Sequence, residues 1–241
     1  DDIPKYLLFL ENVFPYMDNY NYQKGMKEII QELKNFLKPK DIGTDSDRAL
    51  LLDFQATLEI KPEKAIKLEK DALAQIENIT ADNARLVSNL HANLGGLYRM
   101  NGHPDLAREH MEKSISLLDQ FNLLHINDSI PQIANYAMFL TEQQEPERGI
   151  SELQKLSGII KEYHSDDCLD YAKVQETLGT IYLMTANLPQ AKTHFKRAFK
   201  IYEKIWADEP EMIEAKYQEI QELYPQIGFC IGKNLSGLLT K

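Results

Sequence analysis

Apolar residues recur at helical spacing along most of the chain, and short stretches rich in Asn, Gly or Pro separate the helical runs. In one clear example, Leu94, Leu97 and Tyr98 share a face of a predicted helix. The sequence NGHP at 101–104 then indicates a turn, and its Pro suits the first position of a second helix. The second helix has its own apolar stripe, formed by Leu106, Ala107, Met111, Ile115 and Leu118. No segment alternates apolar and polar residues for long enough to favour a strand, so the sequence predicts an all-α fold.

This two-helix pattern repeats with a period of 42 residues. The prolines keep the step at Pro62, Pro104 and Pro146, and small residues keep it at Ala65, Ala107, Gly149 and Ala191. Because several kinds of position share one period, we predict hairpins that stack and bury their apolar faces against one another. The predicted domain is a single array over 1–241, with a degenerate hairpin at about 6–40, four units of 42 residues at 45–207, and C-terminal capping helices at 210–241.

Pairs of small residues twelve positions apart predict where the two helices of a hairpin cross. These pairs are Gly95 with Ala107, Ala137 with Gly149, and Gly179 with Ala191. Small side chains at both positions let antiparallel helices approach closely. Asp53 opposite Ala65 breaks the rule, so we expect looser packing in the first full unit.

The charge and the cysteine content narrow the class of protein. The net charge is −10, from 27 basic and 37 acidic residues, which disfavours nucleic acid as a partner. No apolar run approaches the roughly 20 residues that span a membrane, and no basic segment precedes the first apolar residues as in a signal peptide. Two cysteines, Cys168 and Cys230, are too few for a disulfide framework, so a cytoplasmic location is expected. The first residue is not Met, and we expect the chain to be a piece of a longer one.

The repeats resemble the tetratricopeptide repeat (TPR) family. Two segments carry the resemblance: Leu94-Gly95-x-x-Tyr98 with Gly102, Ala107 and Ser114, and Leu178-Gly179-x-x-Tyr182 with Ala191, Phe195 and Ala198. The resemblance covers about residues 8–224, but His91 and Gln175 stand where the family has an early Trp. The period also exceeds the usual 34 or so residues. It is similar to the longer-helix subgroup found in kinesin light chains and in sensor arrays of bacterial NTPase regulators.

The resemblance implies a right-handed superhelical solenoid whose concave groove is lined by the first helix of each hairpin and holds a peptide. In this family the residue just before the conserved Leu faces the groove, and here that position holds Leu51, Asn93, Asn135 and Thr177. Nearby positions of the same helices hold Asn89, Arg99, Thr141, Lys173 and Thr180. An Asn side chain can donate to and accept from a peptide backbone, so all of these residues except Leu51 form the predicted peptide-binding site. The alternative is a concave face that is merely polar and solvated.

The sequence contains no motif of a known catalytic site, and we expect no enzymatic activity and no cofactor. The nearest approach to a metal site is His164-Ser-Asp-Asp-Cys168, for which a solvated linker is the favoured interpretation over metal binding. A basic stripe on one helical face consists of Lys192, Lys196, Lys200 and Lys204. It fits either a patch for an acidic partner or the solvated outer face of a second helix, and the second interpretation is favoured.

We therefore predict a protein-interaction module that binds a peptide or protein segment, as the sensing or scaffolding part of a larger regulator. Two alternatives stay open: a non-catalytic domain of an enzyme whose active site lies in a missing domain, and an oligomerisation array that forms a homo-oligomer. Nucleic acid and membrane are not expected partners.

Overall fold

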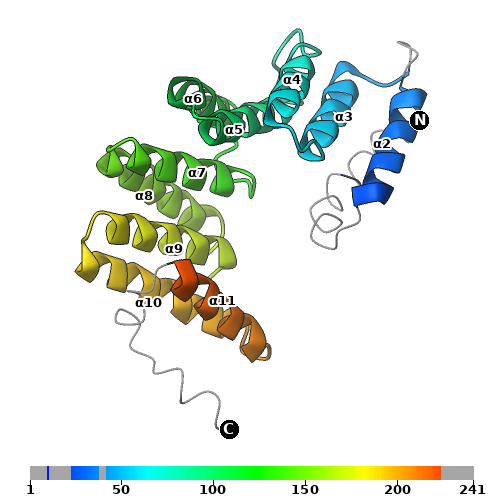
Figure 1. Cartoon of the computed structure of the whole chain (residues 1–241). Coiled ribbons are helices and arrows are strands. Elements are labelled where there is room, and N and C mark those ends of the chain that lie inside the picture. Colours follow the sequence, from blue (N-terminus) through cyan, green and yellow to red (C-terminus); the bar gives the residue numbers. More distant parts are fainter. Residues whose placement is uncertain (1–9, 11–22, 38–41, 224–241) are drawn as a thin grey trace. The chain divides into compact units, whose positions relative to one another are not determined.

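The computed structural model describes residue 10, residues 23–37 and residues 42–223. Within these residues the regular structure is entirely helical. The helices are α2 (Gln23–Phe36), α3 (Asp45–Thr57), α4 (Pro62–Leu73), α5 (Ala84–Met100), α6 (Pro104–Gln120), α7 (Ser129–Glu142), α8 (Pro146–Tyr163), α9 (Leu169–Met184), α10 (Leu188–Ile205) and α11 (Pro210–Leu223). Figure 1 shows that α3 to α10 pair in chain order, with the two helices of each pair side by side.

The helix boundaries follow from local chemistry. Pro62, Pro104 and Pro146 each begin a second helix, where the missing N–H of proline leaves no hydrogen bond unmade. Thr44 caps α3: its hydroxyl accepts from the Asp47 N–H at 3.2 Å, and its own N–H donates to the Asp47 carboxylate at 2.6 Å. The sequence signals at these boundaries therefore predict the hairpins correctly.

Three hairpins close with the same backbone turn. Gly102, Gln144 and Ala186 lie 42 residues apart and have φ of 75°, 64° and 58°. The next N–H in each turn donates back to a carbonyl five residues earlier, as His103 does to Tyr98 at 2.9 Å. A left-handed residue is strained unless it is glycine, so Gln144 and Ala186 adopt a conformation that the surrounding helices impose.

The chain divides into two compact bodies, an N-terminal body of residues 1–123 and a C-terminal body of residues 124–241. In the N-terminal body, α2 packs on α3 through an apolar cluster that includes Met26, Ile30, Leu33, Leu51 and Phe54. A smaller cluster joins α3, α4 and α5 through Ala49, Ala72 and Leu90. Burial of these side chains, rather than helix propensity, provides most of the stability of such short helices.

The C-terminal body contains α7 to α11. Its largest fully buried side chains include Phe139, Phe195 and Tyr202. Helix α11 packs on α10, where the Tyr217 ring stacks on the Phe199 ring with centroids 4.1 Å apart. The last hairpin of the body therefore has an apolar surface that α11 covers.

Two of the three predicted helix crossings are confirmed as close approaches of the paired small residues. A Cβ atom on Gly95 would lie 3.3 Å from the carbonyl oxygen of Ala107, and one on Gly149 would lie 2.6 Å from that of Ala137. At Gly179 the three atoms nearest to an added Cβ all belong to the Phe195 ring, and the closest would lie 2.9 Å away.

The single array over 1–241 stays a prediction. The expected N-terminal hairpin falls partly on residues 6–9, 11–22 and 38–40, and the expected C-terminal cap partly on 224–241, which lie outside the described residues.

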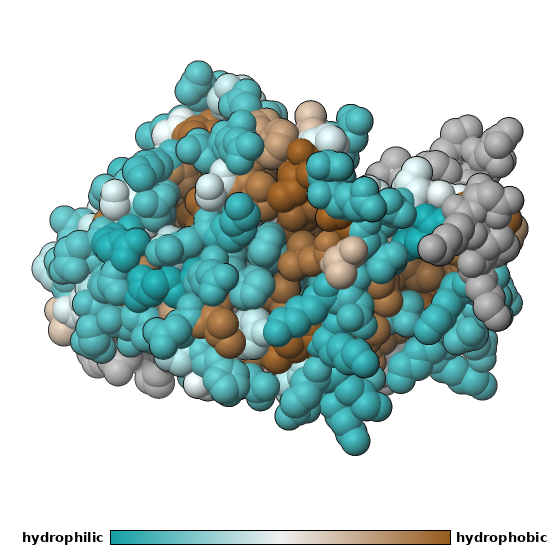
Figure 2. All heavy atoms as spheres, turned by 90° about the horizontal axis from the view of Figure 1, so that it is seen from above, coloured by the Kyte–Doolittle hydropathy of each residue, from teal (hydrophilic) through white to brown (hydrophobic). Residues whose placement is uncertain are grey.

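Figure 2 shows a face that is mostly hydrophilic, with hydrophobic residues gathered in a band between hydrophilic ones. Among the described residues, no helix is long and apolar enough to cross a membrane.

Candidate functional site

The first helices of the C-terminal body carry three of the predicted binding residues on their surface. Asn135 on α7 is exposed, and within the described part of the chain its side chain makes no hydrogen bond. On α9, which contacts α7, Thr177 is half-buried and its hydroxyl donates to the Lys173 carbonyl at 3.0 Å. The exposed Lys173 ammonium lies 3.8 Å from the Asp170 carboxylate. Asn135 therefore offers a complete amide to a partner, while Thr177 and Lys173 have local partners.

Two other predicted residues of this body are buried. Thr141 is 6% exposed and its hydroxyl donates to the Ala137 carbonyl at 2.9 Å, one helical turn earlier. Thr180 is 8% exposed. Both side chains therefore contribute little to the surface of this body.

In the N-terminal body, Asn93 is exposed as expected, but its amide already has partners. The Nδ2 atom donates to Asp53 Oδ1 at 2.9 Å and to Glu69 Oε1 at 3.2 Å. Asn89 and Arg99 are half-buried on the same helix, α5, and each has an interaction within the chain. Leu51, at the equivalent position of α3, is buried beneath α2 and is not available to a ligand.

Both partners of the Asn93 amide are carboxyl groups, that of Asp53 on α3 and that of Glu69 on α4, and the two groups form a pair. Glu69 is 2% exposed, and a hydrogen bond joins its carboxyl group to that of Asp53. Burial raises the pKa of Glu69 to about 10, and the charge of Asp53 adds to the increase. Among the described residues, Glu69 Oε2 has no donor. An ionised Glu69 would leave that oxygen unsatisfied, whereas the protonated group can donate to Asp53, so Glu69 holds its proton at neutral pH.

The sequence contained one signal for this cluster. Asp53 stands where the other hairpins have a small residue, which predicted only looser packing in this hairpin. Glu69 gives no signal of its own, because a Glu next to a Lys in a charged helix is typical of a solvated face. Its burial depends on where α3 and α5 lie, and the sequence pattern does not fix that arrangement.

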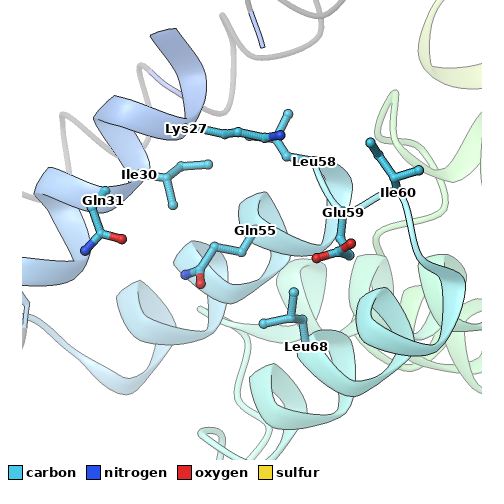
Figure 3. A pocket seen from close by; sticks show the side chains of 8 residues that line it. All are labelled: Lys27, Ile30, Gln31, Gln55, Leu58, Glu59, Ile60 and Leu68. Atoms are coloured by element: carbon cyan, nitrogen blue, oxygen red, sulfur yellow. The ribbon is translucent and has the colours of Figure 1, made fainter. Parts of the chain in front are cut away.

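A recess with a volume of about 300 Å³ lies between α2, α3 and α4 of the N-terminal body (Figure 3). Its lining consists of Lys27, Ile30, Gln31, Gln55, Leu58, Glu59, Ile60 and Leu68. Ile60 is 85% exposed. An apolar wall with polar groups around it suits the apolar side chain of a partner rather than a reaction.

The structure places the two polar clusters that the sequence offered for other chemistry in a loop and on an exposed helix face. Cys168 caps α9: its sulfur accepts from the Tyr171 N–H at 3.4 Å, and its thiol donates to the Ser165 carbonyl at 3.2 Å. The four lysines of the stripe are all exposed on α10, and Lys204 forms an ion pair with Asp167. Both observations fit the favoured interpretations of a linker and an outer helix face.

Histidines join the helices of two hairpins at equivalent positions. His110 of α6 stacks on Tyr98 and its Nδ1 lies 2.9 Å from His91 Nδ1. Eighty-four residues later, His194 of α10 stacks on Tyr182 and its Nδ1 lies 2.9 Å from Gln175 Oε1. The position of the family's early Trp is therefore occupied by a hydrogen-bonding partner for a histidine of the second helix.

We expect His91→Gln to preserve stability near pH 7.5 and to make the chain less sensitive to acid. Burial lowers the pKa of His91 to about 4, and His110 and Lys113 add smaller effects. The unfolded chain then binds more protons than the folded chain between about pH 6.5 and 4. The stability associated with the neutral imidazole is thus present above pH 6.5 and is lost as the pH falls through this window. Gln at position 91 copies the Gln175–His194 pair and removes this titration.

Urea unfolding of the parent and the variant at pH 7.5 and pH 5 measures this effect. His103→Gln, at an exposed histidine of the same hairpin, is the matched control and should follow the parent. Equal losses of stability at pH 5 in the parent and in His91→Gln would contradict the assignment.

Part of the chain is similar to a known protein family. Residues 129–204, which include α7 to α10 almost completely, match the tetratricopeptide repeat family. In sequence, no curated protein matches the chain. The predicted resemblance to this family is confirmed.

Solved structures share the fold. The crystal structure of BtubC (BKLC) from P. vanneervenii is 19% identical, with a TM-score of 0.61, and the match covers 76% of this chain and 72% of that one. A second similar structure is the Q17M crystal structure of nearly identical TPR-like repeats, from a Podosopora anserina protein described as a kinesin light chain. It is 13% identical with a TM-score of 0.64, and the match covers 86% of this chain and 99% of that one. A second structure of those repeats is 13% identical with a TM-score of 0.61, and the match covers 81% of this chain and 96% of that one. The predicted all-α, TPR-like fold class is confirmed.

Proposed function

We propose that the chain binds a partner protein segment on the first helices of its hairpins. Residues 129–204 match the tetratricopeptide repeat family, whose repeats generally mediate protein–protein interaction without catalysis. The partner lies along α7 and α9 in the C-terminal body and along α5 in the N-terminal body. The chain acts as the sensing or scaffolding part of a larger regulator.

The observation that carries the proposal is the amide of Asn135. It is exposed on α7, and the equivalent position of the contacting helix α9 holds Thr177. An extended partner backbone has one donor and one acceptor per residue, and both must be satisfied when it is buried. An Asn side chain supplies the complementary pair whatever the partner's side chains are.

The experiment uses a partner segment captured by the whole chain and then synthesised as a peptide. Asn135→Ala should weaken its binding by about 1–3 kcal/mol, because a partner group loses its hydrogen bond. Asn127→Ala, at an exposed Asn in the loop before α7, is the matched control and should bind like the parent. Calorimetry gives both affinities, and thermal unfolding checks that both variants fold.

Two results would contradict the proposal. If Asn135→Ala binds like the parent while Lys192→Glu or Lys196→Glu abolishes binding, the partner lies on the lysine stripe of α10 instead. If the chain captures only copies of itself, the array serves oligomerisation.

A further inference from the structure

Helix α10 differs in charge from the other second helices of the hairpins. It contains five basic residues and one acidic residue. Basic and acidic residues number three and three on α4, two and four on α6, and three and three on α8. The net charge of the whole chain is −10, so the positive charge of α10 runs against the overall balance.

The positive charge of the lysine stripe is mostly unpaired. Three of its exposed lysines make no ion pair and no hydrogen bond with the described residues: Lys192, Lys196 and Lys200. The fourth, Lys204, forms the ion pair with Asp167. The one acidic residue of α10, Glu203, accepts a hydrogen bond from the Tyr217 hydroxyl at 3.3 Å and forms no ion pair with the stripe.

The equivalent positions of α6 show how a solvated second helix balances its charge. Arg108 and Glu112 stand 84 residues before Lys192 and Lys196, and their side chains form an ion pair at 3.9 Å. On α10 the same two positions hold like charges one turn apart, and like charges at this spacing lower the stability of a helix. Exposure alone fits a solvated face, but a row of unpaired like charges indicates a face that a charged partner neutralises.

We propose that the face of α10 formed by Lys192, Lys196 and Lys200 is a second docking surface, which binds an acidic helix of a partner protein. The surface lies on the second helix of a hairpin, so it goes beyond the proposed function, which uses the first helices. Each ammonium group forms a charge-assisted hydrogen bond with one Asp or Glu carboxylate of the partner.

The spacing of the three lysines specifies the spacing of the partner's carboxylates. Successive lysines are four residues apart, which corresponds to about 6 Å along the axis of α10. A partner helix with an acidic residue at every fourth position repeats at the same distance, and it can lie along α10 with one carboxylate at each ammonium group. The four-carbon stem of lysine is flexible, so the two helix backbones need not approach closely.

The surroundings of the stripe favour a short acidic segment over a larger polyanion. The three lysines span about 12 Å along the helix axis. Helix α11, which packs on α10, has four acidic residues and one basic residue (Figure 1). A nucleic acid or an anionic membrane extends far beyond the stripe and is repelled by such acidic neighbours, whereas a single helix along α10 avoids them.

The test uses the whole chain and two fluorescein-labelled peptides of the same composition. One is (Glu-Ala-Ala-Gln)5, and the other is an isomer whose glutamates fall on all sides of the helix. At low ionic strength (Glu-Ala-Ala-Gln)5 should bind several-fold more tightly than the isomer. Because salt screens exposed charges, its affinity should fall by about tenfold between roughly 0.05 M and 0.3 M salt.

A triple variant removes the stripe without touching the packed face of α10. Its affinity for (Glu-Ala-Ala-Gln)5 should fall by about tenfold, and thermal unfolding should show a chain at least as stable as the parent, because like-charge repulsion is relieved. The three changes are Lys192→Gln, Lys196→Gln and Lys200→Gln. The matched control removes the same charge from three exposed lysines at the start of α4 and should bind like the parent; its changes are Lys61→Gln, Lys64→Gln and Lys67→Gln.

Equal affinities for the two peptides, or equal losses in the two triple variants, would mean general attraction and would overturn the docking surface. If the parent binds phosphatidylserine vesicles or single-stranded DNA but not the peptide, and the α10 variant loses that binding, the stripe serves another anion and the proposal is wrong. Asn135→Ala should bind (Glu-Ala-Ala-Gln)5 like the parent. If the stripe fails while Asn135→Ala weakens binding of the captured partner, the proposed function stands without it.

Discussion

Gly149→Ala is expected to destabilise the C-terminal body by about 1–3 kcal/mol, although it adds a single methyl group to a helix. Gly149 has an ordinary helical backbone, so alanine meets no conformational penalty there. The added Cβ would lie 2.6 Å from the Ala137 carbonyl oxygen and 3.2 Å from its carbonyl carbon. Both are backbone atoms of α7, and they cannot rotate away as a side chain can. The two helices must separate, and the packing around Leu153 and Phe139 is disturbed.

Gly158→Ala is the matched control, because it lies in the same helix, α8. A Cβ on Gly158 meets no atom within 4 Å. Alanine there should stabilise the chain by about 0.5–1 kcal/mol through its higher helix propensity. Urea unfolding of both variants measures the difference. Equal stabilisation by both alanines would show that α7 and α8 do not cross at Gly149.

The hairpins could be predicted from the sequence because their signals are local. Proline at a helix start and apolar residues at helical spacing act within a few residues, and the structure has helices beginning at Pro62, Pro104 and Pro146. The positive φ of the turn was predictable at Gly102, because glycine adopts a left-handed backbone conformation without strain. At Gln144 and Ala186 the packing of the helices on either side imposes the same conformation, and neither residue type predicts it.

The surface of the first helices was only partly predictable, because exposure depends on which helix covers each position. Leu51 and Asn93 hold the same place in successive repeats, yet α2 buries Leu51 while Asn93 is exposed. Thr141 and Thr180 are buried by the neighbouring helices of the C-terminal body. The partners of Asn93 come from 40 and 24 residues away, so the carboxyl pair beside it appears only when α3, α4 and α5 are placed.

The pH dependence of stability should change most at Glu69, where we expect Glu69→Gln to stabilise the chain by roughly 3 kcal/mol at pH 8. Burial raises the pKa of this carboxyl group from 4.5 to about 10, with Asp53 as the second cause. Gln keeps the shape of the side chain and needs no proton. Its amide N–H can donate to Asp53, and its Oε1 can accept from Asn93.

The sign follows from the protons bound in each state. Between about pH 4.5 and 10 the folded chain keeps a proton on Glu69 that the unfolded chain releases. The free energy of unfolding therefore falls as the pH rises through this window, by about 1 kcal/mol per pH unit from this group. The stability that the protonated group provides is fully present below pH 4.5 and is lost toward pH 10.

Urea unfolding from pH 5 to pH 8.5 of the parent, Glu69→Gln and Glu63→Gln separates this group from the rest of the chain. Glu63 is exposed in the same helix, α4, so its replacement should shift stability by a few tenths of a kcal/mol and leave the slope with pH unchanged. Glu69→Gln should be close to the parent at pH 5 and should lose stability much more slowly toward pH 8.5. If Glu69 were instead ionised and held by a partner, Gln would destabilise the chain at pH 8, and the carboxyl pair would not share a proton. The direction of this one change therefore decides whether Glu69 holds a proton in the folded chain.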